Sequence, residues 1–197
     1  MRIKHLILIA FFLTTIAISS VGKEIESNST EQTLTENQEL RTATNTDSIL
    51  IEQQVSHDFS QVGKKDKFYI CIRGKSITEG QVIFTITSHD NREILREEFP
   101  SYLLMNYGFI GDLESEKDRV KYMTSRIKEF FKEKNFYSPA IKEDEVFNED
   151  FSDKEIWTEI KSDRTAIGFH YLIGEEDGRK IAYSKKAKKV VMYFNCC

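Results

Sequence analysis

The sequence lacks the short motifs that mark the commonest enzyme classes. It has no G-x-S-x-G, no phosphate-binding P-loop and no dinucleotide-binding glycine pattern. Some hydrolases carry no short motif, so this absence weakens the enzyme hypothesis without excluding it. The sequence therefore predicts no cofactor and no catalytic residue, and it favours a non-catalytic protein.

Metal-binding patterns are missing as well. Beyond residue 22 the histidines are His57, His89 and His170, and no two of them have a metal-ligand spacing. The acidic run 143–155 has no glycine, which a helix–loop–helix calcium site needs at its sixth position, and phenylalanines interrupt it. We expect no metal ion, and we interpret the run as a solvated connector.

The N-terminus has the three parts of a secretory signal peptide. Arg2 and Lys4 precede an apolar run that reads "LILIAFFLTTIAI", and Ser20 and Gly22 supply small residues before Lys23. Thirteen helical residues rise about 20 Å, which is short for a hydrocarbon core of about 30 Å. No cysteine follows the run to accept a lipid. We expect residues 1–22 to be removed and the protein to be periplasmic or extracellular, without stable membrane insertion.

Charge and composition divide the rest of the chain. The whole chain has a formal net charge of −4, and removing Arg2 and Lys4 makes it −6, which argues against a nucleic-acid partner. Residues 23–47 are rich in Thr, Glu, Asn and Ser and have no helix or strand period, which predicts a disordered spacer. Residues 48–197, about 150 in number, form one predicted domain.

Three strands are predicted in the first part of this domain. The segment "KDKFYICIRG" places Phe68, Ile70 and Ile72 on one face of a strand, and "GQVIFTIT" places Val82, Phe84 and Ile86 on one face of a second. The turn "SHDNRE" joins the second strand to "EILREEF", so Gly80 to Phe99 is predicted to be a hairpin.

Two helices follow in the predicted order. Ser115 and Asp118 resemble a capping box at the start of the first helix, which we expect to end near Asn135. Ser152 and Glu155 form the predicted capping box of the second. Three more strands, "TAIGFHYLI", "RKIAYS" and "KKVVMYFN", end the chain. The predicted fold is therefore α+β, with antiparallel sheets from an N-terminal and a C-terminal three-strand group and two helices between them.

The C-terminal hairpin is a candidate binding surface because its positive charges are concentrated in a short span. They are Arg179, Lys180, Lys185, Lys186, Lys188 and Lys189. A surface of this kind suits an anionic glycan or an acidic protein, whereas the alternative is that the charges solubilise and protect a hairpin edge.

The cysteines are Cys71, Cys196 and Cys197. Export would permit a stable disulfide, and Cys71 and Cys196 both lie in or beside predicted strands. We expect Cys71 to pair with Cys196 rather than with Cys197. Vicinal pairing of Cys196 with Cys197 and fully reduced cysteines are the alternatives.

The C-terminal segment 164–197 and the segment "KDKFYICIRGKSITEG" resemble small exported proteins of uncharacterised function from Bacteroidota. The resemblance implies a Gram-negative periplasm or exterior and implies no activity. We therefore expect an exported, soluble, non-catalytic binding protein of the cell envelope, whose partner is a protein or an envelope polymer. The alternatives are an exported hydrolase whose site is assembled from sequence-distant residues, and a structural envelope protein without a ligand.

Overall fold

The computed structural model describes residues 48–106, 113, 115–174 and 176–196. All of them lie within one compact unit, Glu39–Cys197. The predicted signal peptide, residues 1–22, and the predicted spacer, residues 23–47, lie outside the described residues. The fold is α+β with two antiparallel sheets and two α-helices, as the sequence predicts, but each sheet has four strands rather than three.

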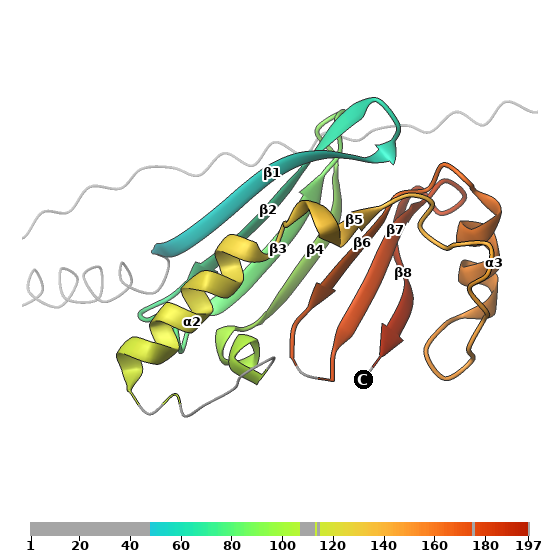
Figure 1. The fold of residues 1–197 in the computed structure, drawn as a ribbon. Helices are drawn as coiled ribbons and strands as arrows, with labels where there is room; N and C mark the ends of the chain where they lie inside the picture. The colour runs from blue at the N-terminus through green and yellow to red at the C-terminus, as the bar shows by residue number, and fades with distance from the viewer. Residues whose placement is uncertain (1–47, 107–112, 114, 175, 197) are drawn as a thin grey trace, which may run out of the picture. The chain divides into compact units, whose positions relative to one another are not determined.

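The first sheet, sheet A, is an antiparallel meander of four consecutive strands (Figure 1). They are β1 (Ile49–Gln61), β2 (Lys64–Arg73), β3 (Gln81–Thr87) and β4 (Glu93–Pro100). The predicted strands correspond to β2, β3 and β4, and the predicted hairpin from Gly80 to Phe99 is confirmed. The sequence analysis missed β1, because Gln53 and His57 interrupt the apolar alternation of the face that carries Val55.

A buried carboxylate on β2 links the end of β1 to the turn between β3 and β4. Asp66 is fully buried, and its Oδ2 accepts a hydrogen bond from the N–H of Ser60 at 2.5 Å while Oδ1 accepts one from the N–H of His89 at 2.7 Å. In the β3–β4 turn, Asn91 has φ of 62°, a left-handed conformation that asparagine tolerates better than most residues. The polar turn sequence is therefore anchored to β2.

The first α-helix, α2 (Glu116–Glu129), follows a 3₁₀-helix, η2 (Ser101–Asn106). Ser115 is its N-cap, as predicted, and the Ser115 hydroxyl accepts a hydrogen bond from the N–H of Asp118 at 3.1 Å. The helix ends before the predicted boundary near Asn135. Phe130 and Phe131, which follow the helix, are buried. A short 3₁₀-helix, η3 (Glu133–Asn135), then connects them to the second sheet.

The second sheet, sheet B, contains β5 (Phe136–Tyr137), β6 (Gly168–Leu172), β7 (Gly178–Ser184) and β8 (Lys189–Cys196) in that order. The predicted C-terminal group corresponds to β6, β7 and β8, and the two-residue strand β5 was not predicted. Gly168 permits the pairing of β5 with β6, because a Cβ atom at residue 168 would lie 2.5 Å from the Tyr137 ring.

The second α-helix, α3 (Lys154–Ser162), begins one residue later than the sequence indicates. Asp153, not Ser152, is its N-cap, and the Asp153 carboxylate accepts hydrogen bonds from the N–H groups of Glu155 and Ile156, both at 2.9 Å. Trp157 and Ile160 lie on the buried side of α3.

Two hydrophobic clusters divide the interior. The larger joins the inner face of sheet A to α2 and to one face of sheet B, and Phe68, Phe84 and Phe169 are fully buried in it. The smaller packs α3 against the other face of sheet B, where Trp157 meets Tyr193 with ring centroids 6.3 Å apart. Figure 1 shows α2 beside sheet A, running along its strands, and α3 beside sheet B. Sheet B is therefore covered on both faces.

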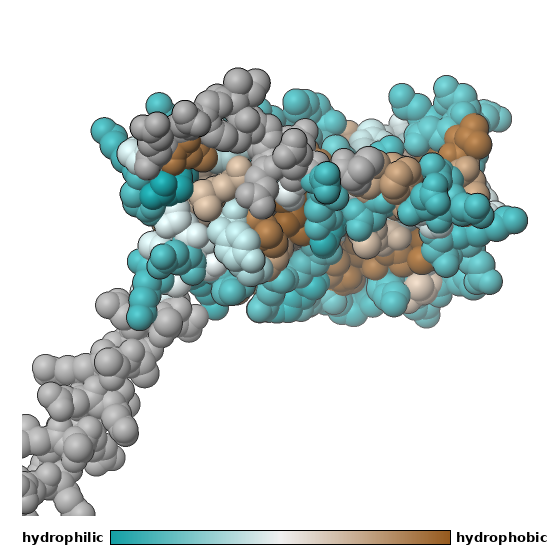
Figure 2. Space-filling model, turned by 90° about the horizontal axis from the view of Figure 1, so that it is seen from below, coloured by the Kyte–Doolittle hydropathy of each residue, from teal (hydrophilic) through white to brown (hydrophobic). Residues whose placement is uncertain are grey.

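One face of the surface exposes part of this apolar interior. Figure 2 shows hydrophilic residues over most of the face seen from below and apolar residues gathered along its middle. Among the helices of the described residues, none is both long and apolar enough to cross a membrane.

Candidate functional site

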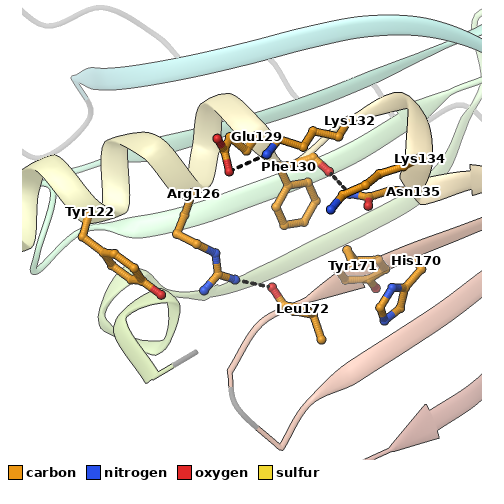
Figure 3. A pocket seen from close by; sticks show the side chains of 10 residues that line it. All are labelled: Tyr122, Arg126, Glu129, Phe130, Lys132, Lys134, Asn135, His170, Tyr171 and Leu172. Atoms are coloured by element: carbon orange, nitrogen blue, oxygen red, sulfur yellow. Dashed lines mark hydrogen bonds and ion pairs between the residues drawn. The ribbon is translucent and has the colours of Figure 1, made fainter. Parts of the chain in front are cut away.

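A pocket lies between the C-terminal half of α2, η3 and β6. Its volume is about 340 Å³, which is at the lower end of the range for small-ligand sites. Figure 3 shows side chains from the helical segment and from β6 meeting in the same space. The lining residues are Tyr122, Arg126, Glu129, Phe130, Lys132, Lys134, Asn135, His170, Tyr171 and Leu172.

Arg126 fixes the two walls of the pocket relative to each other. From α2, its Nη1 donates to the backbone oxygen of Leu104 at 2.9 Å, and its Nη2 donates to the backbone oxygen of Leu172 at 2.9 Å. The planar guanidinium suits this task because it presents several donors in a rigid arrangement. Its positive charge thus stays at the pocket in a fixed position.

The rim of the pocket is basic. Lys132 forms an ion pair with Glu129 at 2.8 Å, whereas Lys134 is exposed and forms no ion pair within the described residues. Counting Arg126, the lining residues carry three positive charges and one negative charge. An excess of two positive charges in a chain whose formal net charge is −4 is a local reversal of sign.

Part of this charge has a structural explanation. Arg126 lies in the last turn of α2, where cations interact favourably with the negative end of the helix dipole. Asn135 completes the helix end, because its Nδ2 donates to the backbone oxygen of Phe130 at 3.0 Å. Lys134 lies in η3, beyond the last turn, and its charge is not explained in this way.

His170 faces the pocket from β6 and is half-buried. Burial and, secondarily, the charge of Lys180 lower the pKa of His170 below its ordinary value of about 6.5, which favours the neutral imidazole. Lys180 is the register partner of His170 on β7. Its ammonium lies 3.6 Å from a Glu145 carboxylate oxygen and 4.8 Å from the centroid of the Phe194 ring.

The floor of the pocket is aromatic and firmly held. The rings of Phe130 and Tyr171 have centroids 5.5 Å apart, and both residues are buried. The Tyr171 hydroxyl donates to Oε2 of Glu97 at 2.9 Å, and the same oxygen accepts from Nη1 of Arg179 at 3.0 Å. This network joins β4 of sheet A to β6 and β7 of sheet B beneath the pocket.

The chemistry that this lining can perform is the capture of an anion. Its single carboxylate, Glu129, is engaged by Lys132, and the lining contains no serine, threonine or cysteine. Within the described lining residues, neither a pair of carboxylates nor a hydroxyl or thiol nucleophile beside a base is assembled. Cationic side chains above an apolar floor are instead suited to an oxyanion attached to a ring or chain.

The basic residues predicted from the C-terminal hairpin do not gather on one surface. Arg179 lies in the network with Glu97 and also forms an ion pair with Asp177 at 2.7 Å. Lys180 lies near the same end of β7 but faces Glu145. The other four, Lys185, Lys186, Lys188 and Lys189, lie at the β7–β8 turn, about 20 Å away along a seven-residue strand.

The predicted disulfide between Cys71 and Cys196 is not formed. Cys71 carries a free thiol and is fully buried in the middle of β2. Cys196 is the last residue of β8 in the other sheet, opposite Gly178. Export permits a disulfide but does not bring two strands together, and the sequence pattern could not show that these strands belong to different sheets. Cys197 lies outside the described residues.

The sequence analysis missed the pocket residues because they come from two segments, 122–135 and 170–172, that are far apart in the chain. One signal was present. Tyr122, Arg126 and Glu129 are spaced so that they share one face of α2. That spacing does not show which strand the face will meet.

No protein-family model, curated protein or solved structure that was compared with this chain matches it.

Proposed function

We propose that this protein is a non-catalytic binding protein that captures a carboxylate- or sulfate-bearing saccharide of an envelope polymer in the pocket between α2, η3 and β6. The observation that carries the proposal is the reversed charge of this pocket, where Arg126 is fixed in place and Lys134 has no ion-pair partner within the described residues. An oxyanion gains charge-assisted hydrogen bonds there that a neutral sugar does not.

The sheet edge beside the pocket favours a saccharide over an extended peptide. Peptides that bind beside a sheet use the free backbone groups of its edge strand. Here β5 pairs with Gly168 and Phe169, and Arg126 already occupies the backbone oxygen of Leu172. Little of the β6 edge therefore remains for a peptide strand to pair with, so side chains would make most contacts to the ligand.

Binding of defined probes tests the proposal. We expect tetragalacturonate to bind in isothermal titration calorimetry, with an affinity that falls as salt is added, and maltotetraose to bind much more weakly. Lys134→Glu should reduce the affinity for tetragalacturonate about tenfold or more, because it replaces an attractive charge with a repulsive one. Lys189→Glu is the matched control, since it makes the same charge change at the β7–β8 turn.

The outcomes separate the alternatives. Equal loss in Lys134→Glu and Lys189→Glu, or loss in Lys189→Glu alone, would move the site to the basic hairpin. Tighter binding of tetraglutamate than of tetragalacturonate would favour a protein partner. Cleavage of tetragalacturonate during a long incubation, detected by chromatography, would contradict the non-catalytic assignment and favour a hydrolase.

The cellular location belongs to the same proposal. The export signal predicted in residues 1–22 would place the pocket in the periplasm or outside the cell, where acidic polymers are accessible. Fractionation of the source cells with N-terminal sequencing tests this step. Intact Met1 recovered from the cytoplasm would contradict it.

A further inference from the structure

His170 is a titratable side chain in the wall of the pocket. The inference drawn from it extends the proposed function and rests on it. The residue lies on β6 at the side of the pocket opposite Arg126 and the basic rim. We propose that His170 makes anion capture pH-dependent: its imidazolium contacts the bound oxyanion in acid, so the ligand binds more tightly as pH falls.

The position of the ring allows it to contact a ligand. Within the described residues, no hydrogen-bond partner engages the His170 imidazole, although the side chain is half-buried. Its Nε2 lies 3.7 Å from where a Cβ atom at residue 178 would be, an ordinary contact distance, so the ring lies beside β7 without crowding. The ring therefore has donor capacity that a ligand in the pocket can use.

Burial is the main reason why the free pocket disfavours protonation of His170, and the positive charge of Lys180 adds to it. Lys180 faces it from β7, and Arg126 and Lys134 face the same space from α2 and η3. The carboxylates nearby are already engaged, since Glu129 pairs with Lys132 and Glu145 pairs with Lys180. The remaining titratable neighbours are Tyr122 of α2 and Tyr171 of β6.

An arriving oxyanion would reverse this balance. It places a negative charge among Arg126, Lys134 and His170, which favours the charged form of the imidazole. Proton binding and ligand binding are then reciprocal, because each raises the affinity for the other by the same factor. If the bound ligand raises the pKa of His170 by about one unit, the affinity changes about tenfold across the titration.

The experiment measures the affinity for tetragalacturonate between about pH 8 and about pH 5, a range in which histidine titrates and uronate carboxylates stay ionised. The variants are His170→Gln, which keeps a polar side chain that cannot become charged, and Lys134→Gln. We expect the wild-type affinity to rise about tenfold towards pH 5 and the affinity of His170→Gln to stay nearly constant. Lys134→Gln should bind more weakly at every pH but keep the wild-type dependence.

A direct titration of the imidazole in the wild-type protein tests the inference without depending on whether the variant folds. In NMR spectra of the wild-type protein, the His170 resonance should titrate at higher pH with tetragalacturonate than without it. Binding that is independent of pH, or a pH dependence that persists in His170→Gln, would overturn the inference and leave the proposed function in place. Absence of binding at every pH would overturn both.

Discussion

Cys71 lies between Glu52 of β1 and Ile83 of β3 in the register of sheet A, and its thiol is fully buried. The sequence indicated a strand residue at this position, which is correct, and a disulfide partner, which is wrong. A cysteine in this setting packs as a small apolar side chain, and its reactivity is limited by access.

We therefore expect Cys71 to resist alkylation in the native protein and to react rapidly in denaturant without any reductant. Mass spectrometry of peptides from protein treated with iodoacetamide under both conditions measures this. Rapid labelling of the native protein would contradict the burial of the thiol, and failure to label in denaturant would restore the disulfide.

Glu97 illustrates a residue whose role the sequence did not reveal. Its neighbours on β4, Arg96 and Glu98, are exposed. Glu97 instead faces sheet B and accepts hydrogen bonds from Tyr171 and Arg179. Glu97→Gln should lower the free energy of unfolding by about 2 kcal/mol, because it leaves the partly buried Arg179 with a weaker partner. Urea denaturation measures the change. Glu98→Gln is the control, since Glu98 pairs with Arg96 on the exposed surface and should contribute under about 1 kcal/mol.

The buried Tyr193 and the partly buried Tyr137 should make the protein sensitive to alkali. The hydroxyls of Tyr137 and Tyr193 lie 2.7 Å apart, and Tyr193 donates to the backbone oxygen of Ala140. Burial raises the pKa of Tyr137 to about 12 and raises the pKa of Tyr193 as well. Because the folded protein favours the neutral phenols, their contribution to stability is complete below about pH 10, the unfolded pKa, and is lost as pH rises beyond it.

Thermal denaturation between about pH 8 and about pH 12 tests this expectation. Tyr193→Phe should lower stability at pH 8, because the hydrogen bond to Ala140 is lost, and should reduce the further loss in alkali. Tyr102→Phe is the matched control, since Tyr102 is exposed on η2. A wild-type protein whose stability does not fall in alkali would contradict the assignment.

At the scale of elements, the sequence pattern located six of the eight strands and both helices, but it did not give their exact ends and it missed one edge strand of each sheet. Strong apolar alternation marks β2 and β3, whose inner faces are fully buried. The missed strands are β1, whose apolar positions alternate with glutamine and histidine, and β5, which has two residues. An edge strand buries less apolar surface, so its sequence carries a weaker periodic signal.

The two ends of a helix also differ in how well a sequence specifies them. Ser115 caps α2 as predicted, whereas Asp153 caps α3 in place of Ser152. Asp153→Ala should destabilise the protein by about 1 kcal/mol, because two N–H groups lose their acceptor, and Ser152→Ala should have little effect. Chemical denaturation of the two variants compares them. A larger loss in Ser152→Ala would restore the original capping box.

The candidate site was less predictable than the elements that build it. Each of its residues lies in an element that the sequence indicated or in the connection η3, but the pocket exists only because α2 and β6 pack side by side. That packing depends on contacts between Phe130 and Tyr171, which are far apart in the chain. Single-sequence patterns report local periodicity and do not encode which faces meet.

At the scale of the whole molecule, Phe169 connects the two sheets. Its ring lies 5.4 Å from that of Phe68 in sheet A and 4.6 Å from that of Phe136 in sheet B. Further rings within 6.1 Å belong to Phe84, Phe130, Phe131 and Tyr171. Aromatic clusters of this kind contribute both buried area and favourable ring geometry.

Phe169→Ala should therefore cost about 3–5 kcal/mol, because it opens a cavity between the sheets that the surrounding rings cannot fill. Phe169→Leu keeps much of the volume and should cost less. Denaturation followed by tryptophan fluorescence, which reports on Trp157 beside sheet B, and by far-ultraviolet circular dichroism should give coincident transitions for the wild type. Separate transitions in the wild type would show that the two sheets unfold independently.

Sheet A is built from four consecutive strands, and this affects how the chain folds during synthesis. All four strands of sheet A precede α2, so the hairpins of the meander can form before any residue that covers them has been made. Until Phe130, Phe131 and Phe169 arrive, the apolar face that carries Phe68 and Phe84 lacks most of the aromatic residues that cover it in the folded protein. A nascent chain at that stage exposes an apolar sheet face that is prone to aggregation, which is the kind of intermediate that chaperones protect. The segments made after sheet A therefore complete a core whose first side is already formed.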